Sequence, residues 1–294
     1  MSPSQLFAFI HRNCGRWSVR LACHVLAVSE SGYYRWAGRK PRTDRDALLW
    51  AEMKQVLAQS PENDNYGIDR MRLALLQRGV EASRSRVYRT MKHHGLIHKK
   101  ARHPNGITRA DAAAQKSENL LSRDFRSDAP GVKLLTDITE IRCCDGKLYL
   151  SAILDCFNGE IVGFSMADNM RAELCVSALR SMSKGFGYRN MIVHSDRGSQ
   201  FTSDAYRKEL AALNATQSMS GTGRCYDNAR MESFFATLKK ELIYRMNSER
   251  FPRAQVQSAV FRYIAGYYNL RRVYTPNPLG LPPALLRTAK SLAA

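Results

Sequence analysis

The alternation of strand-like and helix-like segments between residues 132 and 245 restricts this chain to few folds. Three apolar, β-branched runs come first, and the breaks between them hold the turn-forming residues "DGK" and "NGE". These runs predict an antiparallel meander with the sequences "VKLLTDITEIRCC", "LYLSAILDCF" and "IVGFSMAD". A helix, a strand, a helix, a short strand and a long helix are then predicted at 171–185, 190–196, 203–214, 216–220 and 229–245.

This βββαβαβα order predicts an α/β layer on a mixed five-stranded sheet, and it matches the ribonuclease H-like architecture. In such a sheet the fourth strand pairs with the first. Asp137 lies within the predicted first strand, and Asp196 lies at the end of the fourth. Glu232 lies one turn inside the last helix, with 35 residues between it and Asp196. The topology therefore brings three carboxylates toward one place.

Three converging carboxylates repel one another, so the arrangement is stable when cations lie between them. Hard oxygen ligands suit Mg²⁺ or Mn²⁺. Two such ions about 3.5–4 Å apart activate a water or a 3′-hydroxyl and stabilise the leaving oxygen of a phosphodiester. The predicted chemistry is therefore that of phosphodiester bonds.

The charge of the chain is distributed unevenly. The formal net charge is +19, with +11 in residues 1–125, zero in residues 126–232 and +8 in residues 233–294. Two basic flanks around a neutral centre are typical of a protein that binds a polyanion, although a solvated basic surface has the same composition. No apolar run approaches the roughly 20 residues that span a bilayer, and no export signal is evident, so we expect a cytoplasmic protein without a membrane partner.

The N-terminal third is predicted to be helical. Amphipathic patterns cover 44–58 and 66–79, the second ending at a capping glycine, Gly79. A third helix, in 81–95, begins after Ser83 and carries four basic residues: Arg84, Arg86, Arg89 and Lys92. This pattern predicts a helix-turn-helix that places the basic helix in the major groove, or a helical hairpin whose basic residues face water. Residues 17–36 resemble a smaller unit of the same kind, and 99–130 lack periodicity and indicate a linker.

The motifs around the three carboxylates identify a family. "VHSDRGSQFTS", together with "SMSGTGRCYDNARMESFFATLKKEL", resembles the OrfB transposases of the IS-three insertion-sequence group, which are relatives of retroviral integrases. "TDIT", "LYLSAILDCFNGEIVGFSM" and the 35-residue gap belong to the same pattern. The resemblance covers nearly the whole chain, because the group also has a helix-turn-helix before its catalytic core. It implies that Asp137, Asp196 and Glu232 form a DDE triad, both catalytic and metal-binding, that holds two divalent cations, Mg²⁺ or Mn²⁺.

The resemblance also suggests DNA contacts. Lys239 lies two helical turns after Glu232 on the same face, where related enzymes touch DNA near the attacked phosphate, although a surface lysine is the alternative. The other candidate DNA contacts are the four basic residues at 84–92 together with Tyr226, Arg230, Arg271 and Arg272. Asn228 is a candidate to cap the last helix or to orient Glu232, and His194 either assists the site or is a packed, hydrogen-bonded histidine.

The C-terminal sequence "YYNLRRVYTPNPLGLPPALL" keeps most of the family's terminal motif, but the usual His-Ser pair is replaced around Tyr274 and Thr275. This departure weakens the expectation that the tail touches DNA. We therefore divide the chain into a helical DNA-binding region, a linker, a catalytic core and a basic helical tail, at 1–98, 99–130, 131–246 and 247–294.

The predicted function is metal-dependent cleavage of insertion-sequence 3′ ends followed by strand transfer. The predicted partners are double-stranded DNA, both terminal inverted repeats and target, an OrfA or OrfA-OrfB fusion product, and further copies of this chain on DNA near the bacterial nucleoid. A non-catalytic DNA-binding regulator and a ribonuclease H-like nuclease are the alternatives. The intact triad argues against the regulator, whereas the basic flanks and the transposase motifs argue against the nuclease.

Overall fold

The computed structural model describes residues 2–38, 45–97, 119–121, 124–186, 188–220 and 228–292. The chain forms two compact units, residues 1–48 and residues 49–294. The basic helix, the sheet and the C-terminal segment lie in the second unit, and the boundaries near 98, 130 and 246 stay a prediction. Most of the predicted linker, 99–130, lies outside the described residues. The described part of the chain holds no helix long and apolar enough to cross a membrane.

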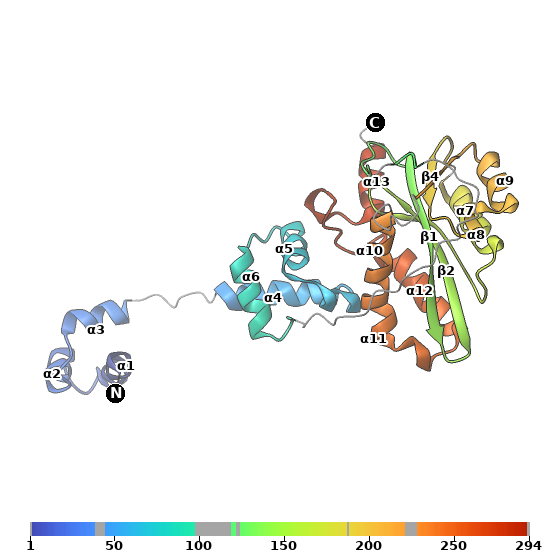
Figure 1. Cartoon of the computed structure of the whole chain (residues 1–294). Helices are drawn as coiled ribbons and strands as arrows, with labels where there is room; N and C mark the ends of the chain where they lie inside the picture. Colours follow the sequence, from blue (N-terminus) through green and yellow to red (C-terminus); the bar gives the residue numbers. More distant parts are fainter. Residues whose placement is uncertain are drawn as a thin grey trace. The chain divides into compact units, whose positions relative to one another are not determined.

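The first unit consists mainly of three short helices, α1 (Pro3–Asn13), α2 (Val19–Val25) and α3 (Glu30–Ala37) (Figure 1). Each helix begins after a serine whose hydroxyl accepts a hydrogen bond from a main-chain N–H of the first turn: Ser2, Ser18 and Ser29. Their apolar faces meet around Ile10, Cys23 and Tyr33. The pair of helices expected within 17–36 is thus present, and α1 completes their core.

The helical region of the second unit follows the predicted pattern. It contains α4 (Arg45–Ala58), a 3₁₀ turn (Pro61–Asn65), α5 (Ile68–Gln77) and α6 (Arg84–His93). Gly79 has a φ of +77°, a left-handed conformation that favours glycine, and it ends α5 as predicted. The Ser83 hydroxyl accepts a hydrogen bond from the main-chain N–H of Arg86 at 3.3 Å, which confirms the predicted start of α6.

The sheet has the order β3-β2-β1-β4-β5. Its strands are β1 (Lys133–Cys143), β2 (Gly146–Asp155), β3 (Ile161–Ala167), β4 (Ile192–Ser195) and β5 (Thr216–Met219). The first three strands pair antiparallel, whereas β4 runs parallel to β1 and to β5. This topology confirms the predicted mixed sheet and the predicted pairing of the first and fourth strands.

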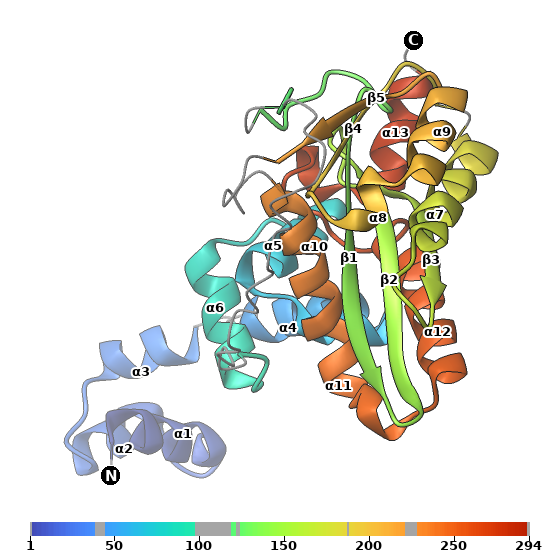
Figure 2. The same cartoon turned by 45° about the vertical axis from the view of Figure 1, so that its right-hand side comes forward.

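The helices cover both faces of the sheet. Leu134 and Leu135 point to opposite faces and belong to two separate clusters. The Leu134 cluster includes buried residues of α7 (Ala172–Phe186) and α9 (Asp204–Ala212), and the short α8 (Ser199–Thr202) leads into α9. On the Leu135 side lie α10 (Ala229–Leu238) and α12 (Arg253–Phe261), and Figures 1 and 2 both show α10 beside β1.

A π-helical turn (Lys239–Ile243) and α11 (Tyr244–Met246) continue α10, so the predicted long helix 229–245 is confirmed with a local widening. The chain then continues through these segments: a 3₁₀ turn (Ser248–Arg250), α12, a π-helical segment (Arg262–Tyr268), a second 3₁₀ turn (Pro278–Gly280) and α13 (Pro283–Leu292). One apolar cluster joins Met71 of α5, Leu150 of β2 and Tyr267 of this tail. The three regions therefore share a core.

A buried carboxylate ties these regions together. Glu241, only 5% exposed, accepts two hydrogen bonds from Arg272, at 2.9 and 2.8 Å. Arg70 of α5 donates a third at 2.8 Å, and the Tyr263 hydroxyl donates a fourth at 2.7 Å. The arginines hold the pKa of Glu241 below its usual range, although burial alone would raise it. This network, which we call the Glu241 hub, connects α5, the extension of α10 and the tail.

We expect Glu241→Gln to destabilise the second unit by about 3–5 kcal/mol, because it leaves Arg272 as a buried, unbalanced charge. Urea unfolding of the full chain measures the change. Glu249→Gln is the matched control, since its ion pair with Arg142 spans 4.0 Å between side chains that are 64% and 75% exposed. The control should cost less than about 1 kcal/mol. Equal effects of the two substitutions on the free energy of unfolding would show that the Glu241 hub stabilises the fold no more than an exposed ion pair does.

The hub also predicts a pH dependence. Because the pKa of Glu241 is lower in the folded state than its ordinary value of 4.5, the unfolded chain takes up the proton first. The stability that Glu241 contributes is therefore complete above about pH 4.5 and is lost as the pH falls through the lower folded pKa. The difference in unfolding free energy between wild type and Glu241→Gln should shrink between about pH 5 and pH 2. A difference that stays constant over that range contradicts the prediction.

Candidate active site

The register of β1 and β4 brings two of the predicted carboxylates side by side. Leu135 lies opposite His194 in this parallel pair, so the same register continued by two residues sets Asp137 level with Asp196. Asp137 is half-buried on the central strand, and its Oδ1 accepts a hydrogen bond from the N–H of Ile138 at 2.8 Å. The pairing predicted from the order of strands is therefore what places these two side chains together.

Asp196 begins the loop that follows β4. Its Oδ1 accepts a hydrogen bond from the N–H of Gly198 at 2.9 Å, which fixes the carboxylate over the turn. A Cβ at Gly198 would lie 3.1 Å from the same oxygen, so glycine leaves room for this close approach. The neighbouring Arg197 directs its Nε to the carbonyl oxygen of Ser220 at 2.8 Å.

The third carboxylate and the predicted lysine come from α10 and its extension. Glu232 lies exposed in the first turn of α10, and Lys239 lies half-buried where the π turn begins. Burial raises the pKa of Asp137 to about 7, and the charges of Asp196 and, to a smaller extent, Glu232 act in the same direction. The structure thus brings the three carboxylates within electrostatic reach of one another.

Lys239 lies within electrostatic reach of Asp137 and of a further carboxylate, Glu140. Burial lowers the pKa of its ammonium, and the negative charges of Glu140 and Asp137 oppose that change. Glu140, which was not among the predicted site residues, accepts a hydrogen bond from Lys147 at 3.0 Å. Residues three apart on a strand point to opposite faces, so its distance from Asp137 in the sequence gave no signal of a charge near Lys239.

The donor groups fit a hard divalent cation in kind, because carboxylate oxygens are the ligands that such ions prefer. The buried Asn228 supplies a further oxygen, Oδ1, which has no hydrogen-bond partner among the described residues. Within the same described residues, no three acidic, histidine or cysteine side chains are gathered closely enough to hold an ion. The residues therefore suit a metal by chemistry, while their side chains are not drawn together at ligand distances.

The two supporting residues have structural partners. Asn228 occupies the position before α10, but its side chain makes no capping hydrogen bond. Instead, its Nδ2 donates to the Thr136 carbonyl at 3.4 Å, next to Asp137. His194 is fully buried, with its ring nitrogens 2.8 and 3.1 Å from the hydroxyls of Ser218 and Ser220. Of the two interpretations offered for His194, the hydrogen-bonded histidine is the one that the structure supports.

The basic residues of α6 remain accessible. Arg89 and Lys92 are exposed, and Arg86 is partly exposed. Arg84 is exposed as well and forms an ion pair with Asp69 at 3.0 Å, between side chains that are 62% and 63% exposed. An ion pair this exposed is weak enough to be exchanged for another anion.

The predicted arginine and tyrosine contacts outside α6 differ in how accessible they are. The prediction of a DNA contact by Arg272 is wrong, because its guanidinium is 3% exposed and is held by both oxygens of Glu241. Arg230 is half-buried and donates through Nη1 to two main-chain carbonyls, at 3.1 and 2.6 Å. Arg271 is exposed, and Tyr226 lies outside the described residues.

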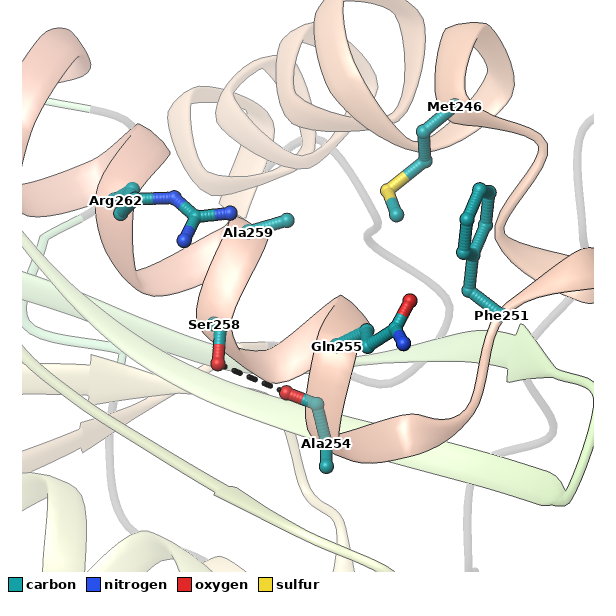
Figure 3. Close-up of a pocket in the computed structure, with 7 residues that line it drawn as sticks. All are labelled: Met246, Phe251, Ala254, Gln255, Ser258, Ala259 and Arg262. Atoms are coloured by element: carbon teal, nitrogen blue, oxygen red, sulfur yellow. Dashed lines mark hydrogen bonds between the residues drawn. The ribbon is translucent and has the colours of Figure 1, made fainter.

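A separate hollow of about 540 Å³ lies on the surface of α12, and Figure 3 shows its lining. Its residues include Met246, Phe251, Gln255 and Arg262, and a hydrogen bond of 2.9 Å joins the Ser258 hydroxyl to the Ala254 carbonyl. The described residues of this lining include none of the three carboxylates and none of the predicted DNA contacts. The hollow is therefore separate from the candidate site.

Comparisons with known proteins identify the families that this chain resembles. The integrase core domain family matches residues 127–225, and the HTH-like domain family matches residues 43–104. Transposase InsF for insertion sequence IS3A of Escherichia coli strain K12 is 34% identical over 267 residues, which are 90% of this chain and 92% of that protein. The insertion element IS600 31 kDa protein of Shigella sonnei is 36% identical over 258 residues, which are 85% of this chain and 92% of that protein.

Among solved structures, a simian T-cell lymphotropic virus intasome aligns with a TM-score of 0.44 at 15% identity. The alignment covers 69% of this chain and 66% of that one.

The HTH-like match also decides between the two interpretations of 66–95, since α5 and α6 lie inside it and are thus a helix-turn-helix-like pair.

The electrostatic coupling of the site can be measured in the absence of metal. With ¹³Cγ-labelled aspartate and excess chelator, the NMR titration of Asp137 should give a pKa of about 7. Asp196→Asn removes a negative neighbour and should lower that pKa, though not to the ordinary value, because burial is the larger cause. Asp204→Asn, on the exposed start of α9, is the control and should leave it unchanged. An unchanged titration in Asp196→Asn would show that the two carboxylates do not interact.

Proposed function

Because the chain belongs to the insertion-sequence transposases of the IS3 group, we propose that it cuts and joins DNA with Asp137, Asp196 and Glu232. As a DDE-type polynucleotidyl transferase it acts on the phosphodiester bonds of DNA. The observation that carries the residue assignment is the β1–β4 register, which sets Asp137 level with Asp196 while α10 presents Glu232. The raised pKa of Asp137, caused by burial and by both other carboxylates, supports the same grouping.

The three carboxylates would hold two divalent cations, Mg²⁺ or Mn²⁺. When bound, the cations lower the pKa of an attacking hydroxyl group and stabilise the charge on the leaving oxygen. The protein's part is to hold three oxygen donors in place, one on β1, one in the loop directly after β4 and one on α10. Asn228 fixes the helix start to β1 through its bond to the carbonyl of Thr136. The main-chain N–H of Gly198 holds the Asp196 carboxylate in place through a hydrogen bond.

The reaction consists of two substitutions at phosphorus. In the first, a water oxygen forms a bond to the phosphorus at the element end, and the 3′ oxygen leaves as a hydroxyl. In the second, that 3′ oxygen bonds to a phosphorus of the target DNA, and a target 3′-hydroxyl leaves. Each step exchanges one P–O bond for another, so neither needs ATP. Lys239, which is half-buried and interacts electrostatically with Asp137, would hold the phosphate under attack.

The basic helix α6 would bind the duplex outside the catalytic core. Its exposed residues Arg89 and Lys92 and the exchangeable ion pair of Arg84 favour a phosphate or groove contact. Arg271, exposed on the tail, is a further candidate. Joining two element ends to one target favours at least two copies of the chain on DNA. We also expect an OrfA or OrfA-OrfB fusion partner, and action at the bacterial nucleoid in the cytoplasm.

The triad is tested with labelled terminal-repeat DNA, Mn²⁺ and any OrfA partner that the element encodes. Asp137→Asn, Asp196→Asn and Glu232→Gln should each lower the rate of joining by about a thousandfold or more, which corresponds to about 4 kcal/mol of transition-state stabilisation. DNA affinity should change little, because each substitution removes a negative charge. Glu173→Gln, in the first turn of α7, is the control and should join DNA normally.

Two outcomes would reject the assignment. If the triad variants joined DNA at the wild-type rate, other residues would carry the chemistry. If the wild type cleaved DNA but never joined it, the nuclease alternative would hold.

A further inference from the structure

A small basic pocket lies on the flank of α10, between that helix, α5 and the segment after Tyr268. Its volume is about 220 Å³. Its lining includes three arginines from different elements and five hydroxyl-bearing residues: Arg70, Arg230, Arg272, Ser233, Thr237, Tyr268, Tyr274 and Thr275. The described residues of the lining include no acidic side chain. Every polar group named is a hydrogen-bond donor, and the guanidinium groups cannot accept.

The charges around this pocket do not balance. Arg70, Arg230 and Arg272 contribute three guanidinium groups, and Glu241, behind them, is the carboxylate that bonds to two of them. Arg272 is fully engaged by Glu241, whereas Arg70 gives it one nitrogen and remains 25% exposed. Arg230 donates to two main-chain carbonyls and has a side-chain hydrogen bond with Tyr274, all of them uncharged partners. A half-buried cation paired only with neutral dipoles is stabilised by an incoming anion.

The pocket opens on the same helix as the candidate catalytic carboxylate. Arg230, Ser233 and Thr237 follow the helical spacing of three and four residues, so they form one stripe along α10. Glu232 is the sequence neighbour of Ser233 and lies about 100° around the helix from it. Glu232 and Ser233 are both exposed. A ligand that lies across the exposed side of α10 can therefore contact both Glu232 and the stripe that contains Ser233.

We propose that this pocket binds a backbone phosphate of the DNA strand that is being cut or joined, at a position near the phosphate under attack. The inference rests on the proposed DNA-joining function. The pocket volume is below the 300–1,000 Å³ typical of sites for drug-sized molecules, and it suits a single phosphodiester group. Arginines and hydroxyls are the donors that proteins use for DNA phosphates. The tail thus contributes to DNA binding through the pocket wall rather than through Arg272 itself.

The test uses the full chain and a fluorescent duplex that ends in the element's terminal repeat, with chelator present so that no chemistry occurs. Ser233→Glu and Thr237→Glu each place a carboxylate at the pocket and should weaken DNA binding about tenfold. The slope of log affinity against log salt should fall by about 1, as for one lost phosphate contact. Ser258→Glu, in the α12 hollow, makes the same charge change elsewhere and should leave both quantities unchanged.

A set of duplexes with one neutral methylphosphonate each identifies the phosphate concerned. Wild type should lose affinity at one backbone position near the 3′ end, and Ser233→Glu should show no further loss at that position. Additive losses at every position would overturn the proposal, as would equal effects of the Ser233 and Ser258 variants. Protection from thermal unfolding by millimolar inorganic phosphate, with no effect of Ser233→Glu on DNA binding, would also overturn it, because the pocket would then serve free phosphate.

The readout separates this proposal from the function on which it rests. Glu232→Gln should bind the duplex normally and fail to join it. If Glu232→Gln joins DNA, the triad assignment fails, while the methylphosphonate measurement still reports on the pocket. If joining depends on the triad and the Ser233 and Thr237 variants bind normally, the pocket proposal alone fails.

Discussion

Burial of one carboxylate organises the second unit. Glu241 is almost completely buried, so its charge is tolerated only when donors from elsewhere surround it. Those donors come from Arg70 of α5 and from Tyr263 and Arg272 of the tail. Glu241 lies nine residues after Glu232 on the same continuous helix. The position of the candidate catalytic helix therefore depends on contacts made by the HTH-like region and by the tail. Both regions help to hold this helix against the sheet.

The parts of the fold that could be predicted from sequence are those that local pattern determines. Period-two runs gave the strands, and the turn sequences between them gave the meander. Gly79 and Ser83 marked helix ends because a left-handed residue and a hydroxyl cap act within one turn. The convergence of Asp137 and Asp196 was also predictable, because it follows from strand order alone. The identity of the triad itself came from the family resemblance and not from these patterns.

Contacts between distant segments could not be predicted. The bond from Arg70 to Glu241 joins residues 171 positions apart, and nothing in either local sequence signals it. For that reason Arg272 looked like one of many arginines available to DNA, when it is a buried partner of Glu241. His194 followed the same logic. Its place two residues before Asp196 left open a role in the site or a packed, hydrogen-bonded histidine, and its two serine partners on and just after β5 became visible only in the fold.

The helix α10 carries an excess of negative charge near one of its stripes and an excess of positive charge near the neighbouring one. On one stripe the charge of Glu232 acts, together with that of Asp196, on Asp137, and cations would stabilise this group of negative charges. On the neighbouring stripe the arginines of the pocket leave positive charge that one carboxylate does not balance. A metal-bound DNA strand supplies both missing partners, cations on one side and phosphates on the other. In the proposed complex, substrate binding would relieve repulsion on both sides of the helix together, so metal and DNA should each favour binding of the other.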